Sequence, residues 1–111
     1  MLLDAIAHSA RNAREGGFDG IELLASQGIL MGQFLSPHTN KRTDEYGGSL
    51  DNRLRYTLQA IDRVREAAGR DFLLGVKLSG DDFTPAGLTL DDAAEIASKL
   101  SATGKLDYIH G

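Results

Sequence analysis

The chain has 111 residues, of which 41% are hydrophobic, and its 12 basic and 16 acidic side chains give a net charge of −4 and a pI near 5.2. This acidic balance provides no basic face for nucleic acid or an anionic membrane, so binding to either is disfavoured. There is no cysteine, no apolar run near the ~18 residues of a membrane span and no signal-peptide pattern, so we expect a soluble, cytoplasmic protein without disulfides or thiolate-bound metal.

The first predicted element is an amphipathic helix at the N-terminus. Apolar residues recur with helical spacing from Leu2 to Ala13, and a pair of glycines at 16 and 17 ends the pattern. Residues 18–24 follow as a short buried strand. Gly28 then begins a connection that we interpret as irregular.

The stretch from Gln33 to Arg55, QFLSPHTNKRTDEYGGSLDNRLR, has a specific order of turn, charged and capping residues. Pro37 fixes its own φ angle, and the glycines that follow Tyr46 permit a tight turn. Ser49 is placed to cap the next helix. The polar side chains between these points can satisfy the loop backbone, so we interpret the loop as scaffold.

Two further helices and strands complete the pattern. A helical stripe begins after Ser49 and ends at Gly69. Residues 72–78 form a nearly continuous apolar run, which is typical of a parallel strand covered on both faces. After a polar loop, Thr89 caps a third helix, and 106–109 begins a third strand. Threefold alternation of helix and strand predicts a parallel α/β sheet or barrel.

The chain from Phe18 to Leu100 resembles the old yellow enzyme family of FMN-dependent oxidoreductases, and the loop that contains TDEYGGSLDNR is its most specific part. Members of that family are single (β/α)8 barrels, and such a barrel needs about 250 residues. The resemblance therefore implies that 1–111 is a fragment of one FMN-binding TIM-barrel domain, with about three consecutive parallel strands and their helices. It also implies FMN as cofactor and NAD(P)H as a candidate electron donor. Any iron–sulfur cluster would lie outside this cysteine-free segment.

From the fold we expect the three strands to be parallel neighbours in chain order, joined by right-handed crossovers. The full-length protein is expected to be the enzyme, and the isolated segment to be inactive. Without the remainder of the barrel, the segment has two exposed sheet edges and an uncovered interior. It should therefore associate or stay loosely packed, and a homo-oligomer of the full-length protein stays open.

The sequence departs from the family pattern where the first strand ends. Family members typically carry His at the position of Leu24 and His or Asn at that of Gln27, a pair that hydrogen-bonds a substrate carbonyl, and many carry a Tyr proton donor at that of Ile29. Leu24 and Ile29 have no exchangeable proton, so the catalytic residues remain unassigned. We expect Leu24, Gln27 and Ile29 to contact the substrate. The Gln27 amide could also contact the flavin or only tie down the loop.

The second strand end carries Lys77, where the family typically has an Arg beside the pyrimidine edge of FMN. A cation there would stabilise negative charge on the reduced flavin. The alternative is an ion pair in the barrel interior, for which Glu22 on the preceding strand is the predicted partner. Both roles could hold at once. Lys77 and Gln27 are therefore the predicted cofactor-binding residues.

Other polar residues have a structural interpretation. His8, at the edge of the first apolar stripe, suits a solvated or capping role, and His38 suits a structural pairing in the loop. The adjacent carboxylates Asp81 and Asp82 suit anchors of a polar loop. For His110, at the end of the third strand, the sequence provides no context. No dinucleotide-binding glycine motif, P-loop or metal-ligand spacing occurs, so no metal is predicted.

Three functions stay open for a protein that acts on a small molecule. Apolar Leu24 and Ile29 favour oxidation or demethylation of an amine by hydride transfer to flavin, which needs no Tyr acid. The first alternative is an NAD(P)H-dependent ene or dienoyl-CoA-type reductase whose proton donor lies elsewhere. The second is a non-catalytic barrel that has lost the active site. The sequence specifies neither the substrate nor the electron donor or acceptor.

Overall fold

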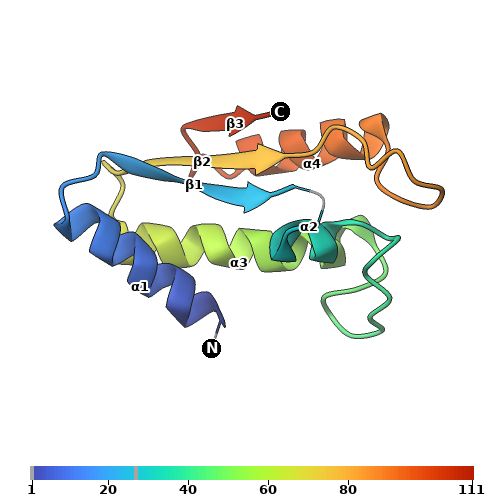
Figure 1. Cartoon of the computed structure of the whole chain (residues 1–111), viewed down its shortest axis with the longest axis horizontal. Helices are drawn as coiled ribbons and strands as arrows, with labels where there is room; N and C mark the ends of the chain where they lie inside the picture. The colour runs from blue at the N-terminus through green and yellow to red at the C-terminus, as the bar shows by residue number, and fades with distance from the viewer. Residues whose placement is uncertain (1, 27) are drawn as a thin grey trace.

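The protein is described by a computed structural model that covers residues 2–26 and 28–111. The elements in chain order are α1 (Leu2–Glu15), β1 (Gly20–Ala25), α2 (Leu30–Leu35), α3 (Leu50–Ala68), β2 (Leu73–Leu78), α4 (Leu90–Ala102) and β3 (Tyr108–His110). The strands form one parallel sheet in the order β1-β2-β3. α1 and α3 lie side by side along the sheet, and α4 connects β2 to β3 (Figure 1). The predicted parallel order is confirmed.

Capping residues set the helix boundaries as predicted. The Ser49 hydroxyl accepts a hydrogen bond from the Asn52 N–H at 3.2 Å, and Gly69, at φ 91°, ends α3. Thr89 and Asp92 form a reciprocal capping box at the start of α4, with distances of 3.1 and 3.2 Å. Because each cap satisfies backbone donors that the helix leaves open, it contributes about 1 kcal/mol to helix stability.

Two elements differ from the prediction. The connection after Gly28 contains α2, whose six residues are too short to show a helical period in the sequence. A Cβ at Gly32 would lie 1.8 Å from the Ser26 carbonyl oxygen, so a glycine is required where α2 approaches the end of β1. β1 starts at Gly20 rather than at 18, because Phe18 belongs to the turn after α1 and is 69% exposed.

The sheet has a helix-facing side and an open side. Alternation along β2 turns Leu74, Val76 and Leu78 toward the helices, where all three are buried. They form one core with the following residues of the other elements: Leu23, Ala25, Leu35, Leu54, Ala60, Ile61, Val64, Ile96 and Leu100. The opposite side of β2 carries Gly75 and Lys77, and none of the described helices covers it. This open side corresponds to the interior of a barrel.

Arg65 of α3 holds the starts of the strands together. Its guanidinium, with the side chain only 13% exposed, donates to the carbonyls of Phe72 and, at 2.7 Å, of Lys105. It also pairs with the Asp107 carboxylate at 3.0 Å, and the same carboxylate accepts the Leu74 N–H at 2.8 Å. These contacts join α3 to the amino ends of β2 and β3. In barrels this end of the sheet serves stability rather than chemistry.

The two outer strands each pair on one side only within the described residues, since β1 and β3 both pair with β2 and not with each other. Together with the open side, these edges are what three strands of a (β/α)8 barrel present without their neighbours. Expressed alone, the 111-residue chain should therefore self-associate, because its edges and interior attract a second copy. Sedimentation velocity checks this prediction. A monodisperse monomer that unfolds cooperatively would contradict it.

None of the helices within residues 2–26 and 28–111 has the length and apolarity needed to cross a membrane. The longest is α3, and it carries Asp, Asn, Arg and Glu side chains throughout its 19 residues.

Candidate functional site

The carboxyl ends of the strands border an open hollow of about 580 Å³. Ser26 follows β1, Lys77 lies near the end of β2, and Gly111 follows β3. The loop after β2 completes the lining with Ser79, Gly80, Asp81 and Phe83, and Leu90 of α4 adds an apolar side chain. In parallel barrels the chemistry takes place at this end of the strands, so the hollow is the candidate active site.

Lys77 is the one cation that lines this hollow among the described residues. It is half-buried, and within 2–26 and 28–111 its ammonium has no hydrogen bond or ion pair. Its neighbours in register are Leu24 on β1 and His110 on β3. The ammonium is therefore available to an anionic group supplied from outside the segment.

The predicted alternative, an ion pair of Lys77 with Glu22, is wrong in this structure. Glu22 does lie on the open side, as the alternation predicts, but its neighbour in register is Gly75, two residues before Lys77. Its carboxylate Oε1 instead lies 3.2 Å from Nδ1 of His110. The contact crosses β2, which is possible because Gly75 has no side chain in between.

Tyr108 fills the space above Gly75. A Cβ at Gly75 would lie only 2.1 Å from the Tyr108 ring, so the ring rests directly on the backbone of β2. Partial desolvation raises the pKa of the Tyr108 phenol, and the neighbouring Glu22 carboxylate raises this pKa further. Glu22, Tyr108 and His110 therefore form one polar cluster on the open side. The sequence signal that could have revealed it is a glycine in the middle of an apolar strand.

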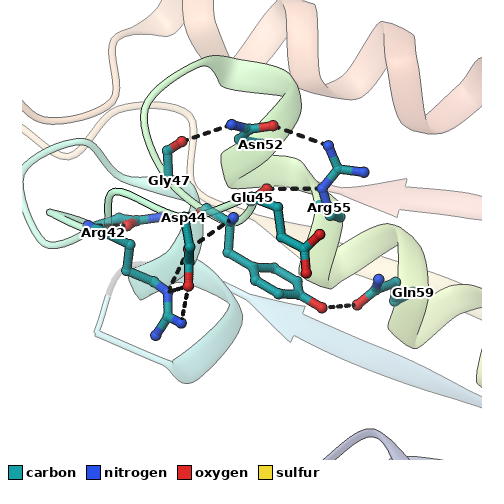
Figure 2. Close-up of polar contacts among 9 residues, drawn as sticks. Arg42, Asp44, Glu45, Gly47, Asn52, Arg55 and Gln59 are labelled. Carbon is teal, nitrogen blue, oxygen red and sulfur yellow. Dashed lines mark hydrogen bonds and ion pairs between the residues drawn. The ribbon is translucent and has the colours of Figure 1, made fainter.

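The loop between α2 and α3 is held by hydrogen bonds among its own residues (Figure 2). The buried Asn40 donates through Nδ2 to the carbonyls of Phe34 at 2.6 Å and Tyr46 at 2.7 Å. Arg42 pairs with Asp44, whose Oδ1 accepts the Tyr46 N–H at 3.0 Å. The hydrogen bond from Arg42 holds the pKa of the Asp44 carboxyl below its usual value. These groups are fully engaged with one another.

Side chains of α3 bind the same loop from the other side. Asn52 Nδ2 donates to the Gly47 carbonyl at 2.9 Å, and Arg55 Nε donates to the Glu45 carbonyl at 2.8 Å (Figure 2). The Tyr46 hydroxyl of the loop donates to Gln59 Oε1 of α3 at 2.9 Å. A Cβ at Gly47 would lie 2.1 Å from the Arg42 carbonyl oxygen, which explains the glycine at this turn. The structure thus agrees with the interpretation of the loop as scaffold.

A buried contact links this loop to the loop after β2. The Ser36 hydroxyl donates to Asp82 Oδ2 at 2.6 Å, and the two residues are 3% and 5% exposed. The Leu88 N–H donates to the same carboxylate oxygen at 2.9 Å. Asp82 is therefore a loop anchor, as predicted. The sequence did not predict its partner Ser36, which lies 46 residues earlier. Next to it, Phe83 adopts φ 54° and exposes 90% of its surface at the hollow.

The other predicted site residues fall in several places. Leu24 is 45% exposed on the open side, level with Lys77, whereas Gln27 lies outside the described residues. Ile29 occupies the N-cap position of α2 and does not line the hollow. The exposed His38 contributes its backbone N–H to Ser36 Oγ at 3.3 Å.

The structural interpretations of His8 and Asp81 also agree with the structure. His8 is exposed on α1, and Asp81 accepts the Phe83 N–H at 2.7 Å as a loop anchor. Within the part of the chain that the structure describes, no three acidic or histidine side chains are grouped so that they could hold a metal ion.

Comparison with known proteins identifies the family. The profile of the NADH:flavin oxidoreductase / NADH oxidase family matches residues 2–110. An N,N-dimethylglycine/sarcosine dehydrogenase of Chromohalobacter salexigens is 47% identical over 107 residues, which cover 96% of this chain and 15% of the relative. A "probable N-methylproline demethylase" of Rhizobium meliloti is 38% identical over 109 residues, with 98% and 16% covered.

A solved structure shows the same arrangement of elements. The structure of a 2-naphthoyl-CoA reductase in complex with 2-naphthoyl-CoA superposes with a TM-score of 0.91 at 34% identity, covering 98% of this chain and 17% of that protein. The chain thus spans about one sixth of the length of each of these three proteins. The match to the family profile over nearly all residues confirms the resemblance to old yellow enzymes and a partial TIM barrel. The chain belongs to the NADH:flavin oxidoreductase / NADH oxidase family.

Proposed function

We propose that the full-length protein is an FMN-dependent oxidoreductase that oxidises, and so demethylates, an N-methylated amine. The observation that carries the proposal is Leu24, which is exposed on the open side of the sheet at the level of Lys77. An apolar side chain there offers no hydrogen bond to a carbonyl and suits the N-methyl groups of an amine. The similarity to an N,N-dimethylglycine/sarcosine dehydrogenase supports the same substrate class.

The residues of the hollow fit a flavin. Bound FMN would supply the hydride acceptor. Lys77 brings a half-buried ammonium without a partner among the described residues, and such a cation favours negative charge on a reduced flavin ring. Gln27 is the second residue that we propose to contact the cofactor. Leu24 would form an apolar part of the substrate site, whereas Ile29, which does not line the hollow, would reach the substrate only from the start of α2.

Anaerobic reduction of the purified full-length protein tests this function. N,N-dimethylglycine or sarcosine should bleach the flavin absorption, whereas NAD(P)H together with an enone should give little turnover. The opposite result would support an NAD(P)H-dependent reductase, for which the likeness to a 2-naphthoyl-CoA reductase is the supporting observation. A colourless protein that takes up no added FMN would support a non-catalytic barrel.

Replacement of Lys77 by methionine tests the cofactor contact. Met keeps the stem and removes the charge, so the two-electron flavin potential should fall by tens of millivolts, where ~30 mV corresponds to ~1.4 kcal/mol. Lys77→Arg should largely preserve the potential. Lys99→Met, which removes the exposed partner of Asp51 on α4, is the matched control and should leave the potential unchanged. An unaltered potential in Lys77→Met would leave Gln27 as the only cofactor candidate in this segment.

A further inference from the structure

The proposed function needs a group that accepts a proton from the substrate, and neither Leu24 nor Ile29 has such a group. Leu24 and Ile29 stand where family members typically have exchangeable protons. However, Leu24 on β1 is in register with Lys77 on β2, and Lys77 is in register with His110 on β3. A residue with an ionisable ring therefore occupies the same level of the barrel interior, two strands away from Leu24.

We propose that His110 is the acid–base catalyst of this protein, with Glu22 as its positioning residue. The inference rests on the proposed amine oxidation. The substrate of that oxidation is an amine that is protonated in water. The role of His110 is to take the ammonium proton before the amine is oxidised. An ammonium nitrogen has no lone pair to support loss of hydride from its methyl group, so a base must act first.

The geometry of the pair orients the ring. Glu22 Oε1 lies 3.2 Å from His110 Nδ1, a distance at which Nδ1–H donates to the carboxylate. Nε2 then carries the free lone pair. Glu22 is in register with Gly75, two residues nearer the strand starts than the level that Lys77 and His110 share. His110 directly precedes Gly111, which lines the hollow.

The charged groups around His110 suit this role. From β1, the Glu22 carboxylate contacts Nδ1 and so fixes the orientation of the ring, as carboxylates do for other catalytic histidines. From β2, the Lys77 ammonium lies in register with the ring, and from the loop after β2, Asp81 borders the hollow. On β3 itself, Tyr108 leans over Gly75 beside Glu22. His110 is thus flanked by one anion and one cation.

His110 Nε2 takes the proton of the substrate ammonium, and the nitrogen regains its lone pair. Bound FMN would serve as the oxidant: a methyl C–H bond would break, its hydrogen and electron pair would leave as hydride, and the nitrogen lone pair would form the C=N bond of an iminium ion. Water adds to the iminium, which separates into formaldehyde and the demethylated amine. His110 returns its proton to solvent.

The test uses His110→Gln in the full-length flavoprotein. With N,N-dimethylglycine near neutral pH, the rate constant of flavin reduction in a single turnover should fall by about 10²–10⁴-fold. The rate should recover at a pH where the amine is itself unprotonated, because the base is no longer needed. Glu22→Gln should give a smaller loss that also recovers. His8→Gln, at an exposed site on α1, is the matched control and should behave like the wild type.

Binding provides a readout that is independent of turnover. Glycine betaine has the same carboxylate and N-methyl groups but no N–H proton, so its Kd, measured by the perturbation of the flavin spectrum, should change less than threefold in His110→Gln. FMN content should also be unchanged. A loss of betaine binding, or a slow rate that persists at high pH, would overturn the proposal in favour of a structural role.

The failure of this inference can be distinguished from failure of the proposed function. If wild-type protein is not reduced by amines at any pH, the proposed function fails, and His110 as its base fails with it. If wild type is reduced and His110→Gln is reduced equally fast at neutral pH, only the role of His110 is refuted.

Discussion

Replacing Arg65 by methionine should lower the free energy of unfolding of the full-length protein by about 2–4 kcal/mol. The substitution keeps the apolar stem of a side chain that is only 13% exposed, but it leaves the Phe72 and Lys105 carbonyls without their donors and removes the ion pair with Asp107. Urea denaturation followed by circular dichroism measures the loss. Arg63→Met, which breaks only the exposed pair with Asp4, is the control and should have a much smaller effect.

The contact with Asp107 also predicts the pH dependence of this difference. The Leu74 N–H, and then Arg65, lower the pKa of Asp107 in the folded protein. A carboxyl with a depressed folded pKa stabilises the fold above its unfolded pKa of about 3.9, and this stabilisation is lost as the pH falls through the folded pKa. The stability gap between wild type and Arg65→Met should therefore narrow below about pH 4. A constant gap would argue against the ion pair.

Asp82→Ala should be the second strongly destabilising substitution, with a loss of about 2–4 kcal/mol. It leaves two buried donors, the Ser36 hydroxyl and the Leu88 N–H, without their acceptor, and each such group costs about 1–3 kcal/mol. Hydrogen exchange should accelerate in the loop after β2. Asp81→Ala is the neighbouring control, since it removes only an acceptor of the Phe83 N–H at the edge of the hollow.

A double-mutant cycle isolates the link between the two loops. Ser36→Ala alone should cost less than Asp82→Ala, because the Leu88 N–H keeps its acceptor. If the hydroxyl and carboxylate interact as the 2.6 Å distance indicates, the double variant should be more stable than the sum of the two losses by about 0.5–3 kcal/mol. Strict additivity would show that the loops are not coupled through this contact.

Local signals in the sequence were enough to predict most of the fold. Ser49 and Thr89 begin α3 and α4 because capping depends on residues three positions apart, and the apolar runs place β1 and β2 to within two residues. β3 begins two residues later than predicted, at Tyr108. Only α2 was missed as an element. Parallel order followed from the alternation of helix and strand.

The choice of partners at the site could not be predicted in the same way. Alternation places Glu22 and Lys77 on one side of the sheet, but it does not give the register between the strands. Glu22 is in register with Gly75 rather than with Lys77, and the expected ion pair was wrong. Glu22 meets His110 88 residues later, across β2, while the Tyr108 ring rests on Gly75 beside them. Contacts of this range depend on the register of three strands, which a single sequence does not reveal.

The alternation along β2 also bears on how such a protein can diverge. Adjacent positions of this strand have different structural roles, since Leu74 and Val76 pack against the helices while Gly75 and Lys77 face the barrel interior. A lineage can therefore exchange the inward set and acquire new chemistry while the outward set preserves the architecture. Leu24 and Lys77, two of the positions where we expect the chain to depart from its family pattern, both belong to the inward set. Substitutions at such inward positions leave the packing of the sheet on its helices unchanged.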